Sequence, residues 1–205
     1  MDRKCNYIHG IDKTQIGSGR KNMAAKHRKH VPAWKRIENK IEDEGRKQCY
    51  LAYGSAAIAL YRHGGLEKDT IMQLFEITHE AWLECAADTS KSMVAMCEEE
   101  TGVEIQNGNG KSWKDLPFLN GQSSKMIFTP ATLAYMRKQQ IQWVAAQVIA
   151  AILVALSRKY DYDADMCARF YAQVQNVQVE FGFDPMKTRD AALEETGVLV
   201  DEYSK

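Results

Sequence analysis

The segment Ala52-Tyr-Gly-Ser-Ala-Ala-Ile-Ala-Leu-Tyr-Arg62 is matched 96 residues later by Val148-Ile-Ala-Ala-Ile-Leu-Val-Ala-Leu-Ser-Arg158. Both segments are rich in small and aliphatic residues that are compatible with an α-helix, and both end in Ala-Leu-x-Arg. Self-similarity at a fixed offset is the signature of an internal repeat, and it decides the fold of the whole chain. The match predicts two related helices, one in each half of the protein.

Three further matches follow in the same order. Leu74-Phe75 corresponds to Phe170-Tyr171, Asp88 corresponds to Asp184, and Glu99-Glu-Thr-Gly-Val103 recurs as Glu194-Glu-Thr-Gly-Val198 at an offset of 95. Four matches in one order indicate a duplication. We therefore expect an all-α fold, a helical bundle made of two pseudo-symmetric three-helix repeats.

Each half carries signals for three helices. Long first helices are expected from about Pro32 to Arg62 and from about Pro130 to Lys159, because a helix accepts proline in its first turn. Apolar residues at helical spacing mark the second helices: Ile71, Leu74, Phe75, Thr78, Trp82 and Cys85, and then Met166, Phe170, Tyr171, Val174, Val177 and Phe181. A short third helix is expected to begin at Asp88 or Asp184 as N-cap and to end at Glu-Thr-Gly-Val, where glycine adopts the left-handed conformation.

Small residues suggest how the long helices pack. Gly54, Ser55, Ala56 and Ala57 are expected to face Ala145, Ala146, Ala150 and Ala151 across a pseudo-twofold axis. The chain then divides into an irregular basic segment (1–31), a first repeat (32–103), an Asn/Gly/Ser-rich connector (104–129) and a second repeat with a short C-terminal tail (130–205).

The composition excludes several classes of protein. With 205 residues, 45% apolar and 26% charged, the chain resembles an ordinary globular protein rather than a disordered or fibrous one. Its 27 basic and 27 acidic residues balance, which argues against a dedicated binder of duplex DNA. The apolar run Ile141–Leu156 is shorter than a membrane span needs and is typical of a buried core helix.

The cysteines and the first residues indicate a reducing compartment. Five scattered cysteines without a Cys-x-x-Cys pair do not form a disulfide framework. Met1–Cys5 lacks the apolar core of a secretory signal. We expect a reduced protein of the cytoplasm.

A basic run is the first candidate binding site. Arg20, Lys21, Lys26, Arg28, Lys29, Lys35 and Arg36 occur without an intervening acid and can neutralise phosphates. No Gly-x4-Gly-Lys-Ser/Thr motif accompanies them. In the connector, Trp113 lies between lysines, a composition suited to stacking on a base. The alternative for the basic run is a solvated arm whose charge is balanced by the acidic stretch Glu38–Glu44. The alternative for Trp113 is a side chain that anchors the connector.

Metal binding and catalysis have weaker signals. Cys5, His9, His27 and His30 are zinc-ligand types, but their spacing matches no common zinc finger, and solvated histidines are the alternative. Asp161-Tyr-Asp-Ala-Asp165 lacks the glycine and distal glutamate of a calcium loop, so helix capping explains it better. No catalytic triad or paired carboxylates can be assembled. We predict no cofactor, no metal and no enzymatic activity.

Glu98-Glu-Glu100 is a cluster of acids at the expected end of a helix. Carboxylates there oppose the helix dipole, which hints that this turn meets a cation or a basic partner.

The repeated unit, from the Ala-Leu-x-Arg helix to Glu-Glu-Thr-Gly-Val, resembles short helical proteins of unknown function encoded by phages and mobile elements of Firmicutes. The resemblance covers about Tyr50–Val103 and Gln147–Val198. It implies a mobile-element context, in which accessory proteins often act by binding host components.

The duplicated helical body predicts a non-enzymatic binding protein. The resemblance implies a phage accessory factor that sequesters a host immune protein or a nucleotide signal. For a nucleotide, the expected ligand residues are Arg20, Lys21, Arg28, Lys29 and Trp113. The alternative is a nucleic-acid-binding protein acting through residues 20–36. A homo-oligomer is also expected, because a pseudo-symmetric helical body offers a face for a second copy.

Overall fold

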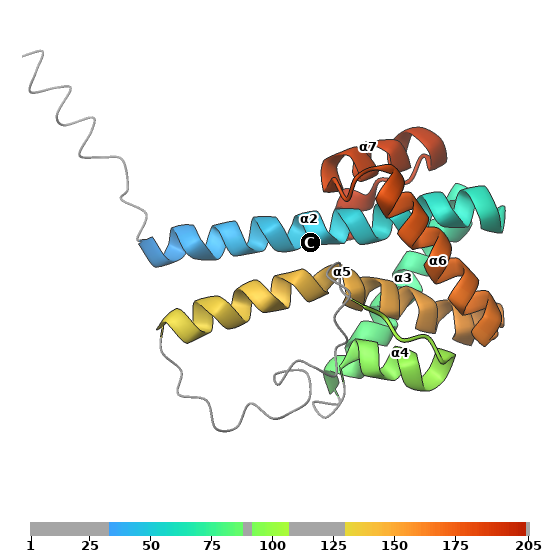
Figure 1. Cartoon of the computed structure of the whole chain (residues 1–205). Helices are drawn as coiled ribbons and strands as arrows, with labels where there is room; N and C mark the ends of the chain where they lie inside the picture. Colours follow the sequence, from blue (N-terminus) through green and yellow to red (C-terminus); the bar gives the residue numbers. More distant parts are fainter. Residues whose placement is uncertain (1–32, 88–91, 107–129, 204–205) are drawn as a thin grey trace, which may run out of the picture. The chain divides into compact units, whose positions relative to one another are not determined.

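The computed structural model describes residues 33–87, 92–106 and 130–203. These residues form α2 (Ala33–Gly64), α3 (Lys68–Ala87), α4 (Met93–Thr101), α5 (Pro130–Tyr160), α6 (Ala164–Glu180), α7 (Pro185–Thr196) and the 3-10 helix η3 (Val200–Tyr203) (Figure 1). No strand occurs in the described part of the chain. The prediction of an all-α fold is confirmed.

The chain divides into two compact units, residues 1–39 and residues 40–205. Of the first unit the structure describes only the beginning of α2, which is helical from Ala33. All packing described below belongs to the second unit.

The bounds of the two long helices agree with the sequence. Each helix ends in a basic turn, Arg62 and His63 in α2 and Arg158 and Lys159 in α5, where positive charge complements the helix dipole. Beyond the ends, the Leu66 N–H donates to the Leu60 carbonyl (3.2 Å) and the Tyr162 N–H donates to the Leu156 carbonyl (3.4 Å). These bonds satisfy carbonyls that the last helical turn leaves free.

The shorter helices of the second half are capped as predicted. The Asp163 carboxylate accepts from the Met166 N–H at 2.8 Å and caps α6, so the capping interpretation of residues 161–165 is confirmed. The Asp184 carboxylate accepts from the N–H groups of Met186 and Lys187 and caps α7, whose first residue is Pro185. Both aspartates satisfy backbone donors that a helix start leaves unpaired.

In the first half the predicted start of the third helix is wrong. α4 begins at Met93, and Ser92 is its N-cap, with its hydroxyl accepting from the Ala95 N–H at 3.3 Å. Asp88 lies outside the described residues. The predicted ends are confirmed, because Gly102 after α4 and Gly197 after α7 take φ angles of 69° and 72°, a conformation that favours glycine.

The core is centred on the long helix α5. Residues 148–156 of this helix are buried, and α5 packs extensively against α3 and α4. Within the described residues, Trp143–Tyr160 is the one window with the length and apolar composition of a membrane span, and 67% of it is buried by the rest of the protein. This burial is what the prediction of a core helix requires.

The predicted contact between small-residue faces is wrong for two of its members. A Cβ added to Gly54 would lie 2.9 Å from Thr188 Cγ2 and 3.0 Å from the Thr188 carbonyl oxygen, so Gly54 faces α7. The Ser55 hydroxyl accepts from Gln178 Nε2 of α6 at 3.2 Å. These residues therefore permit the close approach of α7 and α6 to α2.

Four cysteines lie among the described residues, and all are free thiols. Burial raises the pKa of the Cys97 thiol to about 12 and the pKa of the Cys49 thiol to about 11. Desolvation disfavours the charged thiolate, so these side chains act as small hydrophobes, as the sequence predicts.

Candidate functional site

The residues predicted to bind a nucleotide all lie outside the described part of the chain, namely Arg20, Lys21, Arg28, Lys29 and Trp113. The possible zinc ligands Cys5, His9, His27 and His30 lie outside it as well. Among the residues that are described, no group of three or more His, Cys, Asp or Glu side chains is placed to hold a metal ion. The structure instead draws attention to two arginines at the ends of the long helices.

Arg158, in the last turn of α5, bridges two helices of the first half. Its Nε and Nη2 atoms donate to the two carboxylate oxygens of Glu100 at 2.8 and 2.7 Å. Its Nη1 atom donates to Glu84 Oε2 on α3. The paired bonds to Glu100 form a bidentate fork, the geometry in which arginine holds a carboxylate most firmly. We call this set the Arg158 cluster.

Arg62, in the last turn of α2, bridges two helices of the second half in the same manner. Its Nε and Nη2 atoms donate to the carboxylate oxygens of Glu195 at 2.8 and 2.7 Å, and its Nη1 atom donates to Glu180 Oε2 at 2.7 Å. Glu180 ends α6, and Glu195 lies in the last turn of α7. We call this set the Arg62 cluster.

Both arginines are fixed in their charged form. Hydrogen bonds to the two carboxylates raise the pKa of each guanidinium above its ordinary value. In return, the hydrogen bond from Arg62 holds the pKa of Glu180 below its ordinary value. Groups stabilised in one protonation state do not exchange protons readily near neutral pH, so the clusters are suited to holding structure together rather than to acid–base chemistry.

The sequence of the acidic turn Glu98–Glu100 hinted at a contact with a cation or a basic partner. This prediction is confirmed for Glu100, which binds Arg158 at 2.7 Å. The opposing effect of the helix dipole is offset because the guanidinium lies directly against the carboxylate.

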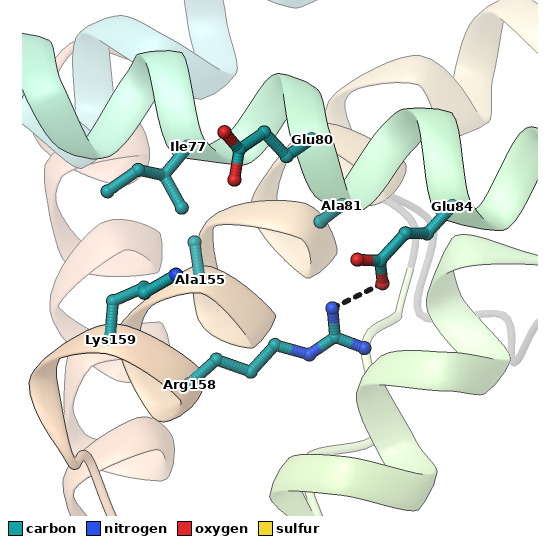
Figure 2. Close-up of a pocket in the computed structure, with 7 residues that line it drawn as sticks. All are labelled: Ile77, Glu80, Ala81, Glu84, Ala155, Arg158 and Lys159. Atoms are coloured by element: carbon teal, nitrogen blue, oxygen red, sulfur yellow. Dashed lines mark hydrogen bonds and ion pairs between the residues drawn. The ribbon is translucent and has the colours of Figure 1, made fainter.

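A pocket of about 420 Å³ lies beside the Arg158 cluster, between α3 and α5. Its lining residues are Ile77, Glu80, Ala81, Glu84, Ala155, Arg158 and Lys159 (Figure 2). Ala81 and Ala155 are buried and form an apolar floor, and the small size of both side chains leaves the space open. The walls are charged, with carboxylates from α3 and basic groups from α5.

Some charged side chains of this pocket are paired with each other, and others are not. Arg158 and Glu84 are already paired with each other. The side chains of Glu80 and Lys159 form no hydrogen bond or ion pair with any other described residue, and neither belongs to the Arg158 cluster. One negative and one positive group are therefore free to meet a ligand in the same pocket.

No family model matches the chain, and no curated protein and no solved structure matches it. The geometry of the site is therefore the evidence for its role.

The sequence analysis did not predict the two arginine clusters, although several of their members belong to the repeated motifs. Arg62 and Arg158 end the repeated Ala-Leu-x-Arg segments, and Glu100 and Glu195 belong to the repeated Glu-Glu-Thr-Gly-Val. A charged residue kept at the same place in both halves was the available signal. The pairing across the halves was not predictable, because nothing in the sequence tells which arginine reaches which glutamate.

Proposed function

We propose that this chain is a non-enzymatic binding protein built from two pseudo-symmetric three-helix repeats, and that the pocket between α3 and α5 receives its partner. The free pair Glu80 and Lys159, open to a ligand beside the fully paired Arg158, is the observation that carries the proposed binding site.

Matching local contacts support the duplication. The Thr101 hydroxyl donates to the Cys97 carbonyl at 2.7 Å and accepts from the Val103 N–H at 3.2 Å. The Thr196 hydroxyl makes the same two bonds, to the Ala192 carbonyl at 2.7 Å and from the Val198 N–H at 3.1 Å. A shared sequence motif with shared hydrogen bonds is expected of two copies of one ancestral module.

The arginine clusters support it further and indicate how the copies fit together. Arg62 of the first half binds glutamates of the second half, and Arg158 of the second half binds glutamates of the first. Such reciprocity is expected at a twofold interface, where each contact from the first partner to the second is matched by the same contact from the second to the first. The repeats would then be interlocked rather than joined end to end.

A binding role fits the chemistry of the pocket better than a catalytic one. Its strongest cation, Arg158, is held between two carboxylates at hydrogen-bonding distance. The remaining charges, one of each sign over an apolar floor, suit a surface that carries complementary charges. Side chains of a protein partner have this mixed character, and their apolar stems would cover Ala81 and Ala155.

The partner we propose is a host protein, and the setting is the host cytoplasm. The resemblance of each half to short helical proteins of phages and mobile elements supports an accessory role, with counter-defence by sequestering an immune protein as the leading form. The expected homo-oligomer belongs to the same proposal. A second copy would double the number of pockets without changing their chemistry.

The test is native mass spectrometry of the full chain purified from the host that carries its gene. Lys159→Glu and Glu80→Lys each place a like charge against the partner, and each should reduce the co-purifying protein at least roughly tenfold. Lys40→Glu is the control, because Lys40 is exposed on α2 and lines no described pocket. The proposal is wrong if no protein accompanies the chain, or if the pocket variants retain it as the control does. The same spectra report the number of copies.

A nucleotide signal is the other ligand that the sequence suggests, held by Arg20, Lys21, Arg28, Lys29 and Trp113. The same spectra would then contain a small anionic mass, and substitution of these five residues would remove it. The proposal of a nucleic-acid-binding protein differs from both. It predicts that binding falls steeply with added salt and disappears when residues 20–36 are deleted.

A further inference from the structure

A second pocket, of about 290 Å³, lies between the end of α2 and the first turns of α6. We propose that it is a binding site for a small organic anion, a phosphate or carboxylate attached to a compact apolar body. The site uses none of the residues of the α3–α5 pocket, so this proposal does not depend on the proposed partner site.

Arg169, the cation of this pocket, has no counter-ion among the described residues. Its guanidinium forms no ion pair or hydrogen bond with any other residue that the structure describes, although Asp165 lies one turn earlier on the same helix. No acidic side chain is among the residues that line the pocket. This contrasts with Arg62 and Arg158, each of which is held by two glutamates. A guanidinium in a concave, acid-free site favours an anion.

The walls add hydrogen-bond donors. The Tyr162 hydroxyl, the Gln173 amide and the His63 imidazole line the pocket. The side chains of Tyr162 and Gln173 make no hydrogen bond to another described residue. Burial raises the pKa of the Tyr162 hydroxyl, which keeps it protonated and able to donate. Hydroxyl, amide and imidazole N–H groups beside a guanidinium can donate to carboxylate or phosphate oxygens.

The floor of the pocket is apolar. Leu60 is 1% exposed and Phe170 is 3% exposed, and both line the pocket. A bare inorganic anion would leave these surfaces in contact with water, whereas an aromatic or aliphatic body would cover them. At about 30 Å³ for each water-sized group, the volume suits a ligand of roughly ten non-hydrogen atoms.

The arginine, the amide and the phenol of this pocket are not repeated at the corresponding places in the first half. Ninety-six residues before Arg169, Gln173 and Tyr162 stand Gln73, Ile77 and Leu66. The first half folds with these residues, so the helical arrangement does not require an arginine, an amide or a phenol there. Their presence at one end only is expected of a ligand site and not of a structural feature of the repeat.

The test is a titration of the full chain followed by the chemical shifts of its backbone amides. Phenyl phosphate and benzoate are the probes, benzylamine is the cationic counterpart with the same ring, and inorganic phosphate is the anion without a body. At least one of the two aromatic anions should produce saturable shifts at Tyr162 and Phe170, with a Kd of about 1 mM, as expected for a ligand of this size. Benzylamine should produce none, and inorganic phosphate should bind more weakly.

Variants assign the binding to the pocket. Arg169→Gln should weaken the tighter anion roughly tenfold, because one charge-assisted hydrogen bond is lost. Arg46→Gln, which removes an exposed charge on α2 outside this pocket, should leave the Kd unchanged. The anion that binds more tightly shows whether the pocket prefers a phosphate or a carboxylate. The proposal is overturned if neither aromatic anion saturates below about 20 mM, if benzylamine binds as well, or if both variants behave alike.

Discussion

Gly54 and Gly45 both lie within α2, and their surroundings are opposite. A Cβ on Gly54 would press against the Thr188 carbonyl oxygen at 3.0 Å, which belongs to backbone and cannot rotate away. A Cβ on Gly45 would meet nothing within 4 Å. The same chemical change therefore has different consequences at two positions of one helix.

We predict that Gly54→Ala lowers the free energy of unfolding by about 1–3 kcal/mol, because α7 must move away from α2. Gly45→Ala should raise it by about 0.5–1 kcal/mol, since alanine restricts the unfolded chain and favours the helix. Urea denaturation of both variants measures these changes. Equal effects of the two substitutions would show that Gly54 is not in a close contact.

Glu180 makes the free energy of unfolding decrease at low pH. Its pKa in the folded state lies below the ordinary 4.5 because Arg62 donates a hydrogen bond to it. The stabilising contribution is therefore complete above the ordinary pKa and is lost as the pH falls through the lowered value.

In Glu180→Gln this contribution is absent at every pH. We predict that the free energy of unfolding of the variant falls less steeply than that of the wild type below about pH 4.5. Chemical denaturation at a series of pH values measures the two slopes. Parallel slopes would mean that the Arg62–Glu180 bond does not persist in solution.

At the scale of helices, the ends of α2 and α5 are held by equivalent bonds. Arg62 with Glu195 and Arg158 with Glu100 have the same two donor–acceptor distances, 2.8 and 2.7 Å. Each arginine is about one-third exposed, so water weakens the interaction without removing it.

Double-mutant cycles on these pairs should give similar coupling energies, about 1 kcal/mol each. The substitutions are Arg62→Gln with Glu195→Gln, and Arg158→Gln with Glu100→Gln. Lys187 with Asp184 is the control cycle, because its atoms are 3.8 Å apart and Lys187 is largely exposed. A coupling energy no larger than that of the control would show that the clusters do not stabilise the contacts between the helices.

The helices were predictable where the local sequence decides their ends. Pro130 begins α5, Asp184 and Pro185 begin α7, and Gly102 and Gly197 follow α4 and α7, because each of these residues is suited to its position by its own backbone or side chain. The start of α4 was not predictable in the same way. Ser92 and Asp88 are both good N-caps, and tertiary packing decides between them.

The candidate sites were less predictable, for a physical reason. Charge runs and lone aromatics, such as residues 20–36 and Trp113, are visible in a sequence without any knowledge of the fold. The pockets instead combine residues from helices far apart in the chain, such as Glu80 with Lys159 and His63 with Arg169. Their proximity exists only after the helices pack.

At the scale of the molecule, α5 determines how the halves depend on each other. It lies in the second half of the sequence, yet it packs extensively against α3 and α4 of the first half. α2 of the first half in turn contacts α7 through Gly54 and Thr188. If the halves are interlocked in this way, neither can open while the other keeps its core.

Native-state hydrogen exchange of the Gly54→Ala variant tests this interlocking most directly. The substitution acts at the contact of α2 with α7, and we predict that protection falls in α4 by the same free energy as in α7, within roughly 0.5 kcal/mol. Faster exchange confined to α6 and α7, with α3 and α4 as protected as in the wild type, would contradict the account.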